Sequence, residues 1–122
     1  MKWLTKTIRR ELRALERARR RFVAKSNEKR LHEVRTTGRR FRSLLEDVAT
    51  IAPSGALCRK VKSAAAATDA ARDATIALQL LERSTPQSEL EAARALLEQL
   101  RERERAAMSR ARVKLKRMRF AP

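Results

Sequence analysis

The chain has 122 residues and a formal net charge of +17, from 31 Lys and Arg against 14 Asp and Glu. Hydrophobic residues make up 43% of it, which is enough for one small folded domain and too much for a disordered chain. So large a positive charge calls for a polyanionic partner, namely nucleic acid, an anionic membrane surface or an inorganic phosphate polymer.

Residues 3–25 have the pattern of an amphipathic helix. One side is apolar, with Leu4, Ile8, Leu12, Leu15 and Phe22. The opposite side carries a basic stripe of Lys2, Lys6, Arg9, Arg13, Arg17 and Arg20. Such a row is usually a solvated face, but like charges four residues apart cost a few tenths of a kcal/mol per pair. Only Glu11 and Glu16 interrupt it, so the stripe predicts that an anion lies along this helix.

A second helix is predicted over residues 28–52, with Ser26 or Asn27 as its N-cap and Pro53 after its end. Its apolar side consists of Leu31, Val34, Gly38, Phe41, Leu45 and Val48. Opposite that side, within about 80° of arc, lie His32, Arg35, Arg39 and Arg42. The only histidine of the chain therefore points away from the core among guanidinium groups, which predicts an anion-binding face.

This helix resembles the signature of the CHAD domains, the conserved histidine α-helical domains. That signature has a His, an Arg three residues later, an Arg pair at seven and eight, and an Arg at ten. The matching residues are His32, Arg35, Arg39, Arg40 and Arg42. The resemblance implies that they bind inorganic polyphosphate.

The third predicted helix, residues 56–83, is rich in alanine. Within it Arg72 and Asp73, followed by Ile76, resemble a second block of the same family. The departures from the family pattern are Thr68, Asp69 and Thr75. The resemblance implies that Arg72 binds the ligand and that Asp73 orients a basic neighbour. Looser candidates for the same anion are Arg59, Lys60 and Lys62.

The fourth predicted helix spans residues 86–120, with Ser84 and Thr85 as hydroxyl caps and Pro86 at its first position. Its apolar seam is made of Leu90, Ala93, Leu97, Leu100, Ala107, Met108, Ala111 and Leu115. The seam is long enough to serve a partner helix. The basic residues at its far end fit either a solvated helix terminus or ligand contact.

Four helices joined by short breaks predict an all-α, antiparallel four-helix bundle. The basic stripes of the first two helices would then form one outward-facing groove. The resemblance covers about residues 4–83. It implies one half of a CHAD domain, because family members typically hold two four-helix units around a central basic cavity. It also implies association with polyphosphate granules. We expect a homodimer that rebuilds the pair, through the seam of the fourth helix or the Gly38 side of the second.

The sequence contains no recognisable set of catalytic residues. One His, one Cys and no Tyr leave no metal-ligand cluster, and there is neither a Gly-rich phosphate loop nor a nucleophile elbow. We therefore expect no enzymatic activity, cofactor or metal. The alternative function is non-sequence-specific nucleic-acid binding. The low content of aromatic residues, only 3%, argues against it because few side chains could stack on bases. A third is an interaction module whose fourth helix docks a partner.

Location can also be predicted. The single cysteine, Cys58, has no partner for an internal disulfide, which favours a reducing compartment. The N-terminal residues lack the apolar run of a signal peptide, and no segment approaches the roughly 18 apolar residues of a membrane span. We therefore expect a cytoplasmic protein without membrane contact.

Overall fold

The computed structural model describes residues 2–121, and the predicted all-α helical bundle is confirmed. Its four α-helices are α1 (Lys2–Ala24), α2 (Glu28–Asp47), α3 (Gly55–Ser84) and α4 (Leu90–Lys116), with a short 3₁₀ turn, η1 (Gln87–Glu89), before α4. Within this part of the chain, none of the helices combines the length and the apolar character needed to cross a bilayer.

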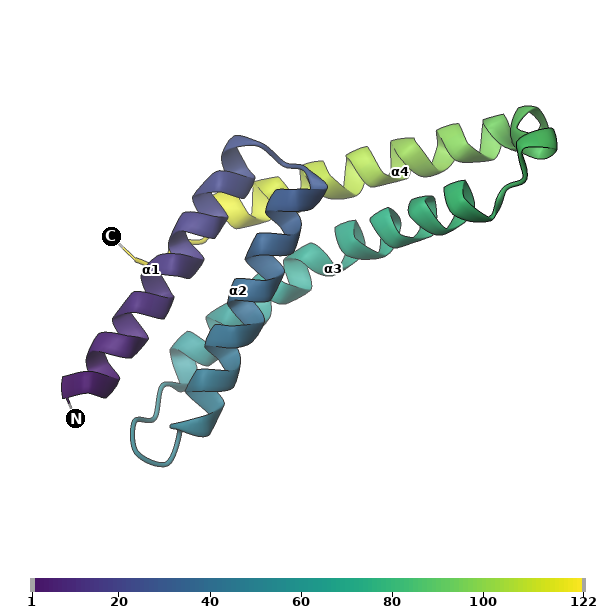
Figure 1. The fold of residues 1–122 in the computed structure, drawn as a ribbon. Coiled ribbons are helices and arrows are strands. Elements are labelled where there is room, and N and C mark those ends of the chain that lie inside the picture. Colours follow the sequence, from purple (N-terminus) through teal and green to yellow (C-terminus); the bar gives the residue numbers. More distant parts are fainter. Residues whose placement is uncertain (1, 122) are drawn as a thin grey trace.

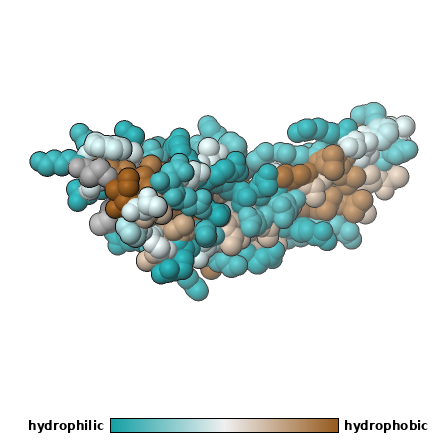
Figure 2. All heavy atoms as spheres, turned by 90° about the horizontal axis from the view of Figure 1, so that it is seen from below, coloured by the Kyte–Doolittle hydropathy of each residue, from teal (hydrophilic) through white to brown (hydrophobic). Residues whose placement is uncertain are grey.

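The helices form two antiparallel pairs of unequal length. α1 pairs with α2, and the longer α3 pairs with α4 (Figure 1). The first pair lies across the half of the second pair that holds the start of α3 and the end of α4, so α2 packs on α3 and α1 on α4. The other halves of α3 and α4 project beyond the first pair. This projecting end carries an apolar area on its surface (Figure 2).

The main core lies where the two pairs cross. Its fully buried side chains include Leu15, Phe22, Phe41, Leu45 and Leu115. The core cluster takes its α3 members from residues 61–74 and its C-terminal members from residues 107–120. Leu78 and Leu97 are also buried, but they lie outside that cluster. The projecting ends of α3 and α4 therefore have a small seam of their own.

The N-cap of α2 is Asn27, one of the two predicted candidates: its side-chain oxygen accepts a hydrogen bond of 2.9 Å from the Arg30 backbone N–H. The end of α2 differs from the prediction, because the helix stops at Asp47 and not at residue 52. The Val48 N–H still bonds back into the helix, but residues 48–51 form turns that lead to Pro53. Proline biases only the residue before it, Ala52, away from helical geometry, so Pro53 does not account for the end of the helix at Asp47.

The last helix is shorter than predicted at both ends. It begins at Leu90, because the Thr85 hydroxyl does not cap it and donates to the Leu81 carbonyl of α3 at 2.6 Å. It ends at Lys116, and the residues after it leave helical geometry. This departure places Phe120 in the core with 7% of its surface exposed.

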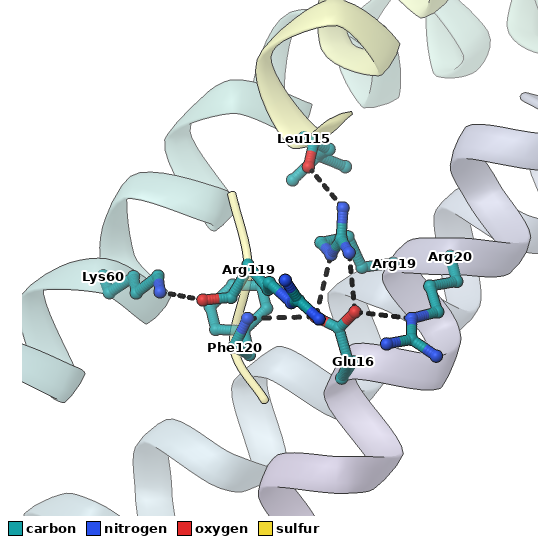
Figure 3. Close-up of polar contacts among 7 residues, drawn as sticks. All are labelled: Glu16, Arg19, Arg20, Lys60, Leu115, Arg119 and Phe120. Atoms are coloured by element: carbon teal, nitrogen blue, oxygen red, sulfur yellow. Dashed lines mark hydrogen bonds and ion pairs between the residues drawn. The ribbon is translucent and has the colours of Figure 1, made fainter. Parts of the chain in front are cut away.

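A buried ion cluster fastens the C-terminal segment to α1 (Figure 3). The Glu16 carboxylate, only 3% exposed, accepts hydrogen bonds from Arg19 Nε at 2.9 Å, from Arg19 Nη2 at 2.6 Å and from the Phe120 backbone N–H at 2.9 Å. Arg20 Nε adds a fourth at 2.8 Å. Arg19 Nη1 donates at 3.0 Å to the Leu115 carbonyl, near the end of α4, which also accepts from the Met118 backbone N–H at 3.1 Å. We call Glu16, Arg19 and Phe120 the C-terminal latch.

The latch changes the acidity of its carboxyl group. Burial raises the pKa of Glu16, but hydrogen bonds from Arg19, the Phe120 amide and Arg20 outweigh burial and lower the pKa from 4.5 to about 2. Glu16 is therefore charged in the folded protein at neutral pH. Its charge is balanced by Arg19, which is also buried.

Candidate anion-binding groove

The basic face of α2 lies next to α3. His32, Arg39 and Arg42 are exposed on this face and Arg35 is partly buried, while the opposite side of the helix supplies Leu31, Val34, Phe41 and Leu45 to the core. The division of α2 into an apolar side and a basic side is thus confirmed. Two hollows lie between this basic face and α3, and together they make the candidate site.

The first hollow has a volume of about 590 Å³ and lies between the N-terminal half of α2 and the middle of α3. Its basic lining residues are Lys29, His32 and Arg35 from α2 and Arg72 from α3. Gln79 of α3 closes one side by donating to the Glu28 carboxylate at 2.5 Å. The structure thus brings His32, Arg35 and Arg72, predicted from two separate segments, into one hollow.

The second hollow, about 300 Å³, lies further along α2. Its charged lining residues are Arg35, Arg39, Arg42, Lys62 and Asp69. Because Arg35 lines both hollows, they adjoin and form one surface, which we call the α2–α3 groove. From His32 to Arg42 this groove follows about three helical turns, roughly 15 Å.

Arg35 is the most constrained side chain of the groove, with 15% of the side chain exposed. Its Nη1 donates to Thr68 Oγ1 at 2.8 Å and to Asp69 Oδ1 at 2.9 Å, both on α3. Its Nε is buried and has no hydrogen-bond partner within residues 2–121. A buried donor without an acceptor is costly, so the contacts with α3 leave the guanidinium incompletely satisfied.

The other cations of the groove differ in how far they are already paired. Arg39, Lys62 and Arg72 make no ion pair with any residue of the described chain, so their positive charges are uncompensated locally. Arg42 pairs with Glu46 at 2.9 Å on its own helix. The His32 ring is exposed, with Nε2 3.4 Å from the Thr36 hydroxyl. An anion in the groove would thus meet several unpaired donors around a fixed guanidinium.

The prediction that α1 forms the second wall of this groove was wrong. The stripe of α1 does not share it: Arg9 and Arg13 line a separate hollow with Lys2 and Lys6, all from α1. Helical periodicity shows which side of a helix faces away from its core, but not which neighbouring helix borders that side. Here α3 crosses beside α2 and supplies the second wall.

The remaining predicted residues are spread over other surfaces. On α1, Arg17 is exposed and Arg20 binds Glu16. Arg40 points to the α1 side of α2 and pairs with Glu11 at 3.1 Å. Lys60, predicted to bind the ligand, lies instead at the C-terminal segment: its ammonium donates to the Arg119 carbonyl and lies 5.4 Å from the centroid of the Phe120 ring.

The orienting carboxylate was assigned to the wrong aspartate. Asp73 is exposed and has no ion pair within the described chain, whereas Asp69 holds Arg35. The sequence interpretation treated Thr68 and Asp69 only as departures from a family pattern, although both of them hold Arg35. A signal was present: Asp69 precedes Arg72 by three residues, so both lie on one face of α3.

Comparison with known proteins gives one match. The family model described as the CHAD domain matches residues 6–122, which includes the whole of α4 and not only the segment up to about residue 83. No match was found among curated proteins or among solved structures.

Proposed function

Because the chain belongs to the CHAD domain family, we propose that it binds inorganic polyphosphate in the α2–α3 groove. The observation that carries this proposal is the state of Arg35, whose Nε is buried without an acceptor at the junction of the two hollows. Unpaired cations lie on both sides of it, Arg72 in one hollow and Arg39 in the other.

The chemistry of the groove suits a bare phosphate chain. Guanidinium groups bind phosphate oxygens with paired N–H donors, and those on α2 recur every three or four residues along one face. Such a chain offers repeating charge and no bases, so its recognition needs spaced donors but no stacking platform. The basic stripe of α1, with Arg9, Arg13, Arg17 and Arg20, would add diffuse contacts where a long chain runs past the groove.

The proposed role is binding without catalysis. The groove offers hydrogen-bond donors and positive charge. We propose that the protein acts in the cytoplasm, on polyphosphate granules. The alternative is non-specific binding of nucleic acid, which a net charge of +17 supports at low salt regardless of any built site.

Competition separates these two functions. The protein, bound to labelled long-chain polyphosphate at near-physiological salt, is titrated with unlabelled polyphosphate or with duplex DNA of equal phosphate content. We expect polyphosphate to displace the label at a concentration at least tenfold lower than DNA. Displacement by DNA at an equal or lower phosphate concentration would overturn the proposal in favour of the nucleic-acid alternative.

We also propose that two copies associate, since the family typically joins two four-helix units. Neither surface that the sequence suggested for this is free. The Gly38 side of α2 faces Leu15 of α1, and much of the α4 seam, such as Leu97 and Ala111, is buried within the chain. The proposed association of two copies therefore requires a different surface.

A further inference from the structure

Charge is distributed very unevenly between the two ends of the molecule. Residues 76–104, the projecting end of α3 and α4 that we call the distal hairpin, contain six glutamates and four arginines. This is a net charge of −2, which leaves +19 for the rest of the chain. Within the hairpin the negative charge is at the tip, where residues 82–91 hold three glutamates and one arginine. The distal hairpin is thus unsuited to a polyanion.

The same hairpin exposes large apolar side chains. Ile76 and Leu80 on α3 are 45% and 64% exposed, and Leu96 on α4 is 49% exposed. Figure 2 shows an apolar area over this end of the molecule. Elsewhere α3 and α4 are covered by α1 and α2, which form a second layer over them, but that layer reaches only the base of the hairpin, where Gln79 bonds to Glu28 (Figure 1). A two-helix layer with an exposed apolar face is an incomplete architecture.

We propose that the distal hairpins of two copies of this chain pair in a two-fold, antiparallel arrangement and bury Leu80 and Leu96. A second copy fits because the molecule is self-complementary: in this arrangement each acidic tip lies towards the basic body of the partner, while the apolar middles face each other. Four helices would then surround a shared apolar seam, as in a four-helix bundle.

The pairing has a consequence that rests on the proposed function. The two α2–α3 grooves border the paired hairpins, since Ile76 and Gln79 line the first hollow, but the basic residues of each groove lie outside the paired surfaces and stay open to ligand. A dimer could then hold one long polyphosphate chain at two points, or connect two chains. In the first case the second contact is intramolecular, and the affinity for long chains exceeds that of a single groove.

The test is the mass of the full chain in solution, by sedimentation equilibrium over a range of protein concentrations without polyphosphate. We expect the wild-type chain to be dimeric and the double variant Leu80→Glu/Leu96→Glu to be monomeric. The matched control is Val113→Glu, because Val113 is also on α4 and 47% exposed but lies outside the hairpin. This control should remain dimeric.

Two results would overturn the inference: a monomeric wild-type chain at every concentration, or dissociation by Val113→Glu equal to that by the hairpin variant. Circular dichroism reports whether the variants keep their helices. Should the glutamate variant unfold, Leu80→Gln/Leu96→Gln removes the apolar contacts without adding charge, and the same monomer is expected.

The failures of interface and function can be told apart. Short polyphosphate, too short to reach two grooves, should bind the Leu80→Gln/Leu96→Gln variant and the wild-type chain with the same affinity per chain. A monomeric wild-type chain that binds polyphosphate in its groove would refute only the interface. A dimer with no preference for polyphosphate over DNA would refute only the function.

Discussion

Arg35 on α2 and Asp69 on α3 form an ion pair of 2.9 Å that joins the two walls of the groove. The carboxylate fixes the guanidinium, but it also places a negative charge where phosphate is proposed to bind. Asp69→Asn keeps a side-chain oxygen that can accept from Arg35 and removes that charge. We therefore expect polyphosphate to bind about two- to fivefold more tightly, roughly 0.5–1 kcal/mol, in a calorimetric titration.

The matched control for this substitution is Asp73→Asn. It makes the same change in charge one turn along α3, at an exposed residue without an ion pair in the described chain. A gain from Asp73→Asn as large as that from Asp69→Asn would show that only the total charge matters.

Removing single donors from the groove should weaken binding much more than removing a charge elsewhere. We expect Arg39→Ala to lower polyphosphate affinity about tenfold, roughly 1.4 kcal/mol, and to reduce the salt dependence by about one charge. We expect His32→Ala also to weaken binding, through loss of its ring donor. Arg83→Ala, on the distal hairpin, should change affinity less than twofold. Equal losses in all three would indicate a diffuse charge effect without a site.

The C-terminal latch should make a large contribution to stability. Glu16→Gln leaves Arg19 buried without a counter-charge, and breaking a buried pair in this way costs about 3 kcal/mol or more. We expect a fall in melting temperature of about 10 °C in a calorimetric scan. The control is Glu98→Gln, an exposed residue whose ion pair with Arg94 spans 3.5 Å and should contribute well under 1 kcal/mol. Similar losses from both substitutions would contradict the role given to the latch.

The lowered pKa of Glu16 also predicts how stability depends on pH. The unfolded chain binds a proton at Glu16 near pH 4.5, whereas the folded protein does so only near pH 2. The stabilisation is therefore complete above pH 4.5 and is lost as the pH falls towards 2, by about 3 kcal/mol. Urea unfolding of the wild-type chain and Glu16→Gln at several pH values measures this. Their difference in free energy of unfolding should shrink between pH 5 and pH 2, and a constant difference would refute the assignment.

Gly38 offers a stabilising substitution. A Cβ atom at this position would lie 3.8 Å from Leu15 Cδ1, an ordinary van der Waals distance, so alanine fits without moving α1. We expect Gly38→Ala to raise the free energy of unfolding by about 0.5–1 kcal/mol, because alanine favours helix over glycine. The measurement is the urea midpoint. A loss of stability would mean that α1 and α2 approach each other too closely at Gly38 to accept a side chain.

The helices and their buried sides could be predicted because both follow from local periodicity. Leu31, Val34, Phe41 and Leu45 recur at helical spacing, and all four are buried. The helix ends were less predictable. At the end of α4, the chain leaves the helix where the contacts of Phe120 with distant residues replace helical hydrogen bonds.

The site could be predicted only in part for the same reason. The basic face of α2 is a property of one helix, so His32 and Arg39 were found from the sequence. Its second wall depends on how α3 crosses α2, which no single-helix pattern contains, and so Asp69 was missed as the partner of Arg35. In the sequence, Glu16 is one acid among many basic residues. Its burial is explained only by the contact with the distant segment around Phe120.

The hydrogen bond between Glu16 and the Phe120 amide joins residues 104 positions apart. On a translating ribosome, which adds on the order of 5–20 residues per second, Glu16 would be made roughly 5–20 seconds before its partner segment. During that interval the Glu16 and Arg19 side chains would remain hydrated, and the apolar stripe of α1 would lack α4. The nascent chain can therefore complete its core only after the segment around Phe120 has been made, and until then it is most exposed to chaperones and proteases.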